Sequence, residues 1–533
     1  MRLLFVRFSI IAVCVLTITS CARRGNPTGG PMDSIPPVMI KTIPPMETVH
    51  FDEDKIRIYF DEYIKLEKIN EQLVISPPQK HDPIITPVGT ASKFISIRIL
   101  DTLDDNTTYS FNFGRSIVDN NEGNELGNFK YVLSTGDYID SLLVAGEVTD
   151  PMLKETASDI DVMLYAYDST YTDSVIFKQK PRYIANTLDS TLFELSNLRE
   201  GKYRMIALKD NNKNKMFDPG GDKIGFITDT VTLPTDKYYE FTVFKEVPEF
   251  SMIKPKEVNK GHLIFGYYGN PEGISIEMTT EVSDDFQYRI TKEKDKDTLN
   301  YWYTPFEADS LNFKVSLADY TEDFTTRIRS EDIDSLRVQN STSSVLHPLD
   351  TFYLEANVPI VAIDTTKFDL VDKDTLAVAY DAFIDEAKSR VYFNFERTYD
   401  NNYSLKMYPG LVTDIFGLTN DSTDLNLNTK TLEDYGILHM QIAGPSDSGY
   451  VVELLNTRDE VLRTAILDQP GTATFEFLSP GMFLVRVTKD VNKNGKWDTG
   501  NFLLRRLPEA IKYFADEIEI RANWEKNENL RFD

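Results

Sequence analysis

The sequence predicts an all-β protein built from tandem β-sandwich domains. Apolar and polar residues alternate with period two in "KIRIYFDEYI" (55–64), "KFISIRIL" (93–100) and "TTYSFNFGRSI" (107–117). Such alternation, rich in β-branched and aromatic residues and broken by Asn, Asp, Gly and Pro, indicates antiparallel strands. Helical periodicity is scarce, and the best helix candidate is 505–518, where Pro508 permits only a short helix. A third observation is that similar segments recur in the same order in both halves of the chain.

The first residues, "MRLLFVRFSIIAVCVLTITSC", combine a short basic region with an apolar run. This pattern predicts a secretory signal peptide over residues 1–20. The end of the run resembles the lipobox of bacterial lipoproteins, and the resemblance implies that Cys21 is lipidated and anchors the chain in the outer membrane. An ordinary cleaved signal and an N-terminal membrane anchor are the alternatives. The run is shorter than the roughly 20 residues that a spanning helix needs.

Residues 21–37 contain the lipidated cysteine and a stretch rich in Gly and Pro without an apolar period. This composition predicts a flexible tether. Lipoproteins exported to the cell surface in some Gram-negative phyla carry acidic residues soon after the cysteine, whereas Arg23 and Arg24 follow it here. A periplasmic and a cell-surface orientation therefore both remain open.

Five segments follow one another in order: "PP" (36–37), "IRIYFDEYI" (56–64), "LDDNTTYSFNF" (103–113), "IVDNNEGNEL" (117–126) and "YVLSTG" (131–136). Together they make residues 38–137 resemble an SbsA-type bacterial Ig-like domain. The family implies a β-sandwich, with Tyr109 buried after a tight turn. Asp119 and Asn120 are expected to hydrogen-bond their own backbone, and Gly123 to take a positive φ.

The rest of the chain repeats this plan. "YIDSLLVAGEV" (138–148) matches "YGILHMQIAGP" (435–445), and Tyr403 and Asp414 align with Tyr109 and Asp119. The segment that follows each Ig-like copy resembles transthyretin-like or Cna-B-like modules. The predicted domains are a transthyretin-like β-sandwich over 138–247, a β domain without a family match over 248–345, a second, weaker Ig-like domain over 346–432 and a second transthyretin-like β-sandwich over 433–533.

Charge and cysteine content exclude several classes of function. The formal net charge of −27 predicts an acidic surface that repels nucleic acid and anionic lipid. Membrane contact is therefore expected through the lipid on Cys21. Only Cys14 and Cys21 are present, so the mature chain has no disulfide or thiolate metal site. The five histidines are scattered, and no nucleophile elbow, P-loop or dinucleotide fingerprint occurs, so no catalytic residues are predicted and the protein is interpreted as not an enzyme.

Two near-copies of one loop, "KDNNKNKMFDPGG" (209–221) and "KDVNKNGKWDTGN" (489–501), place oxygen-bearing side chains at alternate positions. This spacing is close to that of an EF-type calcium loop, which supplies ligands from positions 1, 3, 5, 7, 9 and 12. The candidate calcium ligands are Asp210, Asn212, Asn214, Asp218 and Asp222 in the first copy and Asp490, Asn492, Asn494 and Asp498 in the second. The bidentate Glu of position 12 is missing from both copies.

Two interpretations of these loops remain open. One is a weak calcium site, with a Kd of about 10⁻⁴ to 10⁻³ M, which makes calcium the one cofactor under consideration. The other is a hairpin loop that closes on itself through Asx-turns without a metal. At position 6, Gly495 is expected to fit the sharp turn, and Lys215 is not.

The predicted function is that of a non-enzymatic outer-membrane lipoprotein, in which β-sandwiches act as a spacer, a scaffold or a binding protein. One alternative is an accessory subunit of an outer-membrane assembly or secretion complex, because acidic, aromatic-rich sandwiches suit protein partners. The other alternative is a carbohydrate-binding or hydrolytic lipoprotein. The expected partners are the outer membrane, through the N-terminal lipid, and a further protein, but not nucleic acid.

Overall fold

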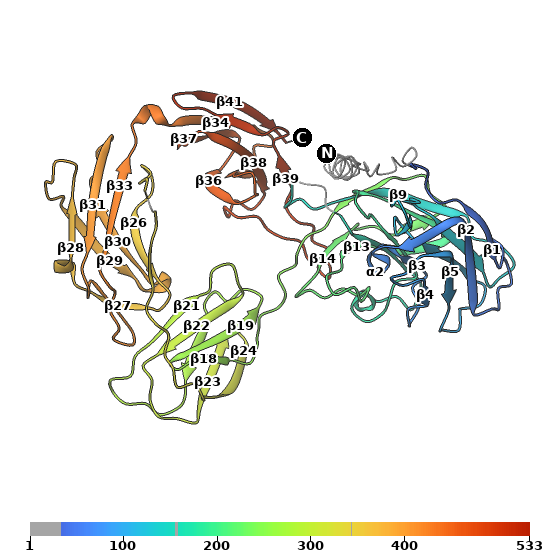
Figure 1. Ribbon diagram of the computed structural model, residues 1–533, viewed down its shortest axis with the longest axis horizontal. Helices are drawn as coiled ribbons and strands as arrows, with labels where there is room; N and C mark the ends of the chain where they lie inside the picture. The colour runs from blue at the N-terminus through green and yellow to red at the C-terminus, as the bar shows by residue number, and fades with distance from the viewer. Residues whose placement is uncertain (1–32, 155–157, 343, 533) are drawn as a thin grey trace, which may run out of the picture. The chain divides into compact units, whose positions relative to one another are not determined.

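The computed structural model describes residues 33–154, 158–342 and 344–532 (Figure 1). Strands account for 48% of the residues and helices for 4%, so the all-β prediction is confirmed. The chain forms two compact units, one up to Ser141 with Asn197–Arg199 and one with Leu142–Ser196 and Glu200–Asp533. The predicted signal peptide, Cys21 and most of the tether lie outside the described residues. Within the described ranges, every helix is too short or too polar to cross a membrane.

The first unit contains two sheets around one core. One sheet has the order β1 (Met39–Ile43), β2 (Lys55–Leu66), β5 (Ser92–Arg98), β4 (Ile84–Thr86), with β7 (Ile117–Asp119) beside β2. The other is β3 (Val74–Ser76), β6 (Thr108–Asn112), β8 (Lys130–Ser134), and a short helix, α2 (Ile69–Gln72), precedes β3. Ile58 of β2 and Phe111 of β6 are both fully buried in the shared core. As the period-two alternation predicts, one face of each strand is buried in the core.

In the second unit, residues 142–242 form a sandwich of mixed pairing. Its larger sheet is β11 (Tyr183–Asn186), β10 (Asp161–Ala166), β13 (Gly201–Lys209), β14 (Lys223–Phe226), with β15 (Val231–Leu233) also on β13. Its smaller sheet is β12 (Leu192–Leu198), β9 (Leu142–Thr149), β16 (Tyr239–Thr242). The first and last strands, β9 and β16, pair in parallel. A 3₁₀ turn, η1 (Asp173–Phe177), links β10 to β11.

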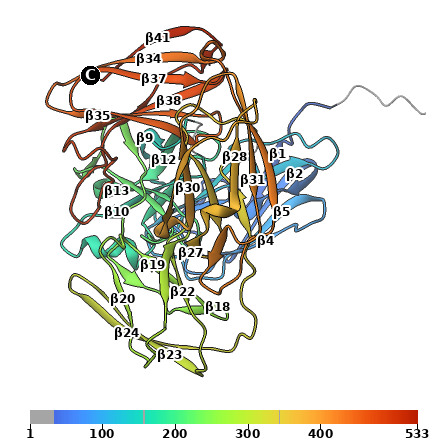
Figure 2. The same cartoon turned by 90° about the vertical axis from the view of Figure 1, so that its left-hand side faces the viewer.

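Residues 436–531 have the same topology. The larger sheet is β36 (Val461–Leu467), β35 (Gly449–Leu455), β38 (Gly481–Asp490), β39 (Ile511–Tyr513), with β40 (Ile518–Ile520) also on β38; the smaller is β37 (Gly471–Leu478), β34 (Gly436–Ala443), β41 (Glu525–Arg531), after η4 (Leu432–Asp434). Again the first and last strands, β34 and β41, pair in parallel. Figure 2 shows β34, β37 and β41 side by side in one layer. Residues 142–242 and 436–531 are thus two copies of one fold.

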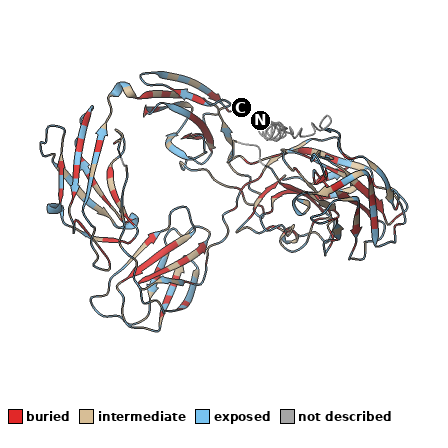
Figure 3. Cartoon of the chain, viewed as in Figure 1, coloured by how far each residue is buried: buried red, intermediate tan, exposed pale blue. Residues whose placement is uncertain are grey.

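Two further sets of sheets lie between these repeats. Residues 251–327 form two sheets. The larger has the order β17 (Ser251–Met252), β19 (His262–Tyr268), β22 (Thr298–Tyr303), β21 (Tyr288–Lys292), with β18 (Lys256–Asn259) also on β19. The smaller has the order β20 (Ser275–Met278), β23 (Ser310–Leu317), β24 (Tyr320–Arg327). Residues 338–429 form β25 (Val338–Asn340), β26 (Phe352–Ala356), β30 (Arg390–Phe395), β29 (Tyr380–Asp385); β27 (Ile360–Ile363) with β32 (Val412–Asp414); and β28 (Phe368–Val371), β31 (Asn401–Met407), β33 (Thr423–Thr429), with turns η2 (Thr365–Lys367) and η3 (Glu386–Lys388). Figure 3 shows buried and exposed residues alternating along these strands.

Two local expectations are corrected. The helix candidate 505–518 contains no helix, because Ile511–Tyr513 instead form β39 and pair with Arg486–Thr488 of β38. The expected boundary at residue 346 lies too late, since β25 (Val338–Asn340) already pairs with β26 of the following sheet. Because the chain divides into two compact units, the finer division into five domains stays a prediction.

Candidate functional site: two repeated Asp/Asn loops

The two Asp/Asn loops leave equivalent strands of the repeated fold. The first Asp/Asn loop (residues 210–222) follows β13, and the second (residues 490–509) follows β38. Each begins with an aspartate at the buried end of its strand: Asp210 is 8% exposed and Asp490 is 1% exposed. Each carboxylate therefore lies at the end of its strand, where the backbone of the loop folds around it.

Within the first loop, the predicted ligands accept hydrogen bonds from the loop's own backbone. Asp210 accepts from the N–H groups of Asn214 at 3.3 Å and Lys215 at 2.7 Å. The side-chain oxygen of Asn212 accepts from Asn214 N–H at 3.1 Å, and that of Asn214 accepts from Met216 N–H at 2.7 Å. These are the Asx-turns of the second interpretation. The carboxylate of Asp218 makes another, with Gly220 N–H at 3.1 Å.

The second loop repeats this pattern closely. Asp490 accepts from Asn494 N–H at 3.1 Å and Gly495 N–H at 2.7 Å, and Asn492 accepts from Asn494 N–H at 3.1 Å. Two side-chain amides, those of Asn492 and Asn494, also donate to the carboxylate of Asp498, the second at 3.0 Å. The structure thus brings together all four ligands predicted in this copy.

A bridging carboxylate closes each loop, and only one of the two was predicted. Asp222 accepts from Asn211 N–H at 3.0 Å and from Asp218 N–H at 2.9 Å. In the second loop Glu509 does the same for Val491 N–H at 2.7 Å and Asp498 N–H at 3.0 Å. Glu509 stands eleven positions after Asp498, whereas Asp222 stands four after Asp218, so an insertion hides the equivalence in the sequence.

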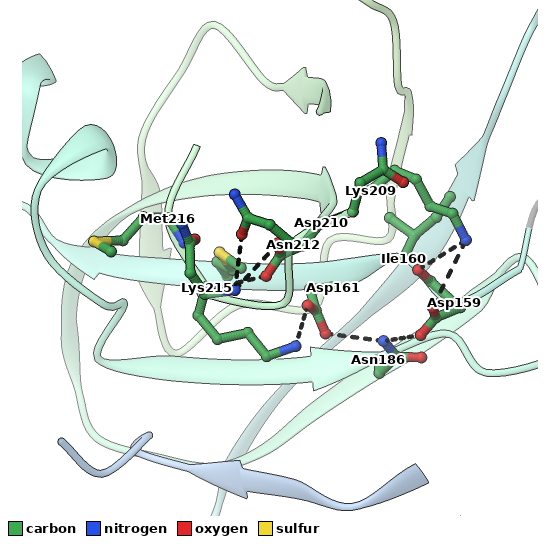
Figure 4. Close-up of polar contacts among 12 residues, drawn as sticks. Asp159, Ile160, Asp161, Asn186, Lys209, Asp210, Asn212, Lys215 and Met216 are labelled. Atoms are coloured by element: carbon green, nitrogen blue, oxygen red, sulfur yellow. Dashed lines mark hydrogen bonds and ion pairs between the residues drawn. The ribbon is translucent and has the colours of Figure 1, made fainter. Parts of the chain in front are cut away.

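The two copies differ at position 6. Lys215 has a φ of 63° and Gly495 a φ of 73°, so lysine adopts the left-handed conformation that we expected only of glycine. Its ammonium lies 2.6 Å from the carboxylate of Asp161, whose side chain is 3% exposed (Figure 4). Burial acts to raise the pKa of Asp161, and Lys215 opposes this effect. Lysine therefore adopts the sharp turn while its side chain reaches the neighbouring strand, and the expectation that Lys215 does not fit this position is wrong.

The second copy lacks both partners of this ion pair. Asp161 pairs across the sheet with Leu208, two residues before Asp210, and the corresponding partner of Thr488 is Val451. A lysine–aspartate pair in the first copy is therefore replaced by glycine and valine in the second. In the described residues, none of Asp490, Asp498 and Glu509 forms a salt bridge.

The insertion in the second loop packs on residues of the 142–247 segment within the same compact unit. Phe502 is completely buried, with its ring 5.4 Å from that of Phe226 at an interplanar angle of 85°. Its backbone N–H donates to Glu246, and Arg505 pairs with Asp173. A Cβ on Gly500 would approach the ring of Phe244 at 2.5 Å, so this position requires glycine. We call residues 499–507 the docking segment.

Whether the loops fit a calcium ion depends on their oxygen atoms. Among the described residues, no three His, Cys, Asp or Glu side chains lie where they could hold a metal ion together. Calcium at the second loop would therefore need amide and carbonyl oxygens as well. For that, the amides of Asn492 and Asn494 would have to present oxygen where they now present nitrogen to Asp498. No observation tests metal binding, and calcium stays a prediction.

The same local tyrosine hydrogen bond occurs once in the first unit and once within residues 338–429. The hydroxyl of Tyr109 accepts from Asp104 N–H at 2.9 Å, and that of Tyr403 accepts from Thr398 N–H at 2.9 Å. Both tyrosines are buried, at 4% and 2% exposure. Tyr109 therefore has the structural role expected of it, and Tyr403, which aligns with it, makes the same hydrogen bond five residues back in the chain.

The aligned aspartates also correspond. Asp119 accepts from the backbone N–H groups of residues 121–124 at 2.7 to 3.2 Å, and Asp414 from those of Phe416 and Leu418 at 2.9 and 2.8 Å. Burial acts to raise the pKa of Asp119, but the backbone donors outweigh it and lower the pKa to about 2. Asp414 has fewer donors, and burial raises its pKa. Fewer backbone donors therefore stabilise the charged form of the aspartate in the second copy of this loop.

Comparison with known proteins agrees with this geometry. Residues 33–135 match the family described as Bacterial Ig-like domain. The resemblance of residues 38–137 to an Ig-like domain is thereby confirmed. A search of curated proteins found no match.

Several solved structures are similar in part. Domains A168–A170 of titin are 12% identical, covering 52% of this chain and 99% of that chain at a TM-score of 0.14. The S-layer protein rSbsC(31-844) is 10% identical, covering 90% of this chain and 67% of that chain at a TM-score of 0.15. The tandem Ig repeats of Dlar are 13% identical, covering 34% and 98% at a TM-score of 0.14. At these scores the likenesses carry no argument about function.

Proposed function

We propose that the protein is a non-enzymatic, lipid-anchored scaffold or binding protein of the outer membrane. The observation that carries the proposal is the Ig-like domain followed by repeated β-sandwiches, an architecture that suggests a spacer, scaffold or binding role. The docking segment adds support, because it fixes one copy of the repeated fold against the other within the second unit. The lipobox-like sequence that ends at Cys21 supports the anchor.

Affinity purification through a C-terminal tag tests the kind of scaffold. Stoichiometric recovery of a β-barrel membrane protein would identify the chain as an accessory subunit of an outer-membrane assembly or secretion complex. Recovery of the chain alone would favour a free spacer. Retention on a panel of polysaccharides, or turnover of them, would instead support the carbohydrate-binding or hydrolytic alternative and contradict the non-enzymatic scaffold.

The lipid anchor gives a direct prediction. Cys21→Ala is expected to move the protein from the membrane fraction to the soluble fraction, because it removes the only thiol at the end of the apolar run. Cys14→Ala is the matched control, since Cys14 lies inside the predicted signal and should leave fractionation unchanged. Fractionation and N-terminal mass spectrometry are the measurements. Continued sedimentation of Cys21→Ala with the membrane, at an unchanged N-terminal mass, would show that Cys21 is not the anchor.

We further propose that calcium binds the second Asp/Asn loop in preference to the first. The second loop has no lysine at position 6, and none of its carboxylates forms a salt bridge in the described part of the chain. In the first loop, the ammonium of Lys215 lies close enough to Asp210 to affect its own pKa, and it would repel an added cation. Calcium would supply charge compensation for the carboxylates of the second loop.

Thermal unfolding in EDTA and in about 2 mM CaCl₂ tests this proposal. For a Kd of about 10⁻⁴ M, the stabilisation is about 1.8 kcal/mol, which raises the Tm of a 100-residue region by several degrees. Asp490→Ala should abolish the shift and Asp210→Ala should not. Identical wild-type curves in the two buffers would leave the self-closed Asx-turn loop as the correct interpretation. A shift that survives in Asp490→Ala would place the ion elsewhere.

A further inference from the structure

The outer face of the larger sheet in the first unit is basic, although the whole chain is strongly acidic. Strand β2 turns Ile56, Ile58 and Phe60 into the core, and the residues between them point outward. We define the basic face by the exposed cations that β1, β2 and β5 carry on this side: Lys41, Lys55, Arg57 and Arg98. The formal net charge of −27 conceals this local concentration of positive charge.

The strand register places these cations next to one another. Lys55 lies directly opposite Arg98, and Arg57 is two residues along β2 from Lys55. Like charges directly opposite each other destabilise a sheet. None of these three residues forms a salt bridge within the described part of the chain. An external anion would relieve their repulsion.

Aromatic rings lie between the cations. The ammonium of Lys41 is 4.9 Å from the centroid of the Tyr59 ring, and the guanidinium carbon of Arg57 is 5.6 Å from that of Phe94. The rings of Tyr59 and Phe94 are themselves 5.6 Å apart. These contacts hold the cationic groups over a flat apolar surface instead of leaving them in bulk water.

The margin of the face is apolar and exposed. Ile43 and Ile84 are each 48% exposed, Phe94 is 37% exposed and Tyr63 is 56% exposed. The ammonium of Lys93 lies over the Tyr63 ring at 5.4 Å and donates to the backbone oxygen of Asp61 at 3.0 Å. Cations combined with exposed aromatic and aliphatic side chains are typical of surfaces that lie at a membrane interface.

We propose that the basic face rests on the anionic lipid surface of the membrane to which the chain is tethered. This inference depends on the proposed anchor at Cys21, from which only twelve residue steps lead to Asp33, the first described residue. Fully extended, they span at most about 40 Å, so the first unit stays close to the bilayer. A planar array of phosphates matches a flat sheet face, and at 0.1 M salt the acidic remainder of the chain is screened beyond about 10 Å. On this proposal the basic face would add a second membrane contact to the lipid expected at Cys21.

Vesicle binding of the lipid-free chain, starting at Ala22, tests the face independently of the anchor. The chain should sediment with phosphatidylcholine vesicles that contain about 30% phosphatidylglycerol, and not with phosphatidylcholine alone. Each cation near an anionic surface contributes about five-fold to binding. Reversal of two charges in Arg57→Glu/Arg98→Glu should therefore weaken binding at least 25-fold, and about 0.5 M salt should have a similar effect on the wild type.

Lys292→Glu/Lys314→Glu is the matched control, because these exposed strand lysines lie in the second unit and the change in net charge is the same. Control binding should equal wild-type binding, and unchanged melting curves would verify that both variants are folded. Equal binding of the Arg57→Glu/Arg98→Glu variant and the wild type would overturn the proposal. So would capture of the wild type by soluble polyphosphate without binding to the anionic vesicles. Because the lipid is absent, failure here is separate from failure of the Cys21→Ala prediction.

Discussion

Lys215→Met is expected to lower the local free energy of unfolding around β10 and β13 by about 3 kcal/mol. The change keeps the length of the side chain but leaves the carboxylate of Asp161 buried without its cation. Removal of one partner of a buried ion pair costs about 3 to 5 kcal/mol, and the lower value applies because the Lys215 side chain is still 30% exposed. The measurement is the loss of hydrogen-exchange protection in the two strands.

The pH dependence of this loss has a definite sign. Burial raises the pKa of Asp161, so the folded state favours the neutral carboxyl once its lysine is gone. A carboxyl with a raised folded pKa loses stability as the pH rises above the ordinary range of an aspartate. The difference between Lys215→Met and the wild type should therefore grow from pH 5 to pH 8.

The residues at the equivalent positions of the second Asp/Asn loop and its neighbouring strand suggest a double substitution that should restore the lost stability. Lys215→Gly combined with Asp161→Val reproduces the pair at Gly495 and Val451, and it removes the unpaired charge and the strained turn together. We expect the double variant to recover most of the lost protection. Losses as large in the double variant as in Lys215→Met would mean that the unpaired carboxylate of Asp161 is not the cause of the loss.

Phe502→Ala is expected to release the docking segment from the 142–247 segment. The ring is fully buried against Phe226, and removal of a buried phenylalanine side chain costs about 3 to 5 kcal/mol. Arg505 and Arg506 would then become accessible to trypsin, because the contact of Arg505 with Asp173 depends on the same docked conformation. A loss of 3 kcal/mol raises the open population, and the rate of cleavage, roughly 100-fold.

Leu503→Ala is the matched control for this experiment. Leu503 is the next residue in the chain and is 56% exposed, so its removal should leave the rate of cleavage unchanged. Phe502→Leu should fall between the two, because it retains part of the buried apolar surface. Equal cleavage of Phe502→Ala and the wild type would show that the docking segment is held by its polar contacts alone.

The strands and the repeated loops were predictable because their signals are local. Alternation in 55–64 shows directly which side chains of β2 are buried, and the Asp119 loop carries its hydrogen-bond partners within five residues. The Asx-turns that begin at Asp210 and Asp490 are likewise encoded in a few neighbouring residues. In these segments the partner of each residue lies a few positions away in the chain, which is why the sequence pattern could indicate the local structure.

The features that were missed depend on partners far away in the chain. Lys215 and Asp161 are 54 positions apart, and nothing near either residue indicates the pair. Glu509 was hidden by the insertion, and Phe502 contacts residues more than 250 positions earlier. The basic face escaped notice because net charge is an average over the chain. The helix candidate at 505–518 failed because pairing with β38 outweighs the weak helical period.

Parallel pairing of the first and last strands gives the repeated fold a particular response to mechanical force. In the C-terminal copy, Ile437 to Ala443 of β34 lie opposite Glu525 to Arg531 of β41, all in the same direction. A pull that separates the start of β34 from the end of β41 would load these hydrogen bonds in shear, so that they must break together. The shorter β9–β16 pair, from Tyr239 to Thr242, offers fewer such bonds. Under tension the earlier copy would therefore yield first, and the C-terminal copy would hold longer.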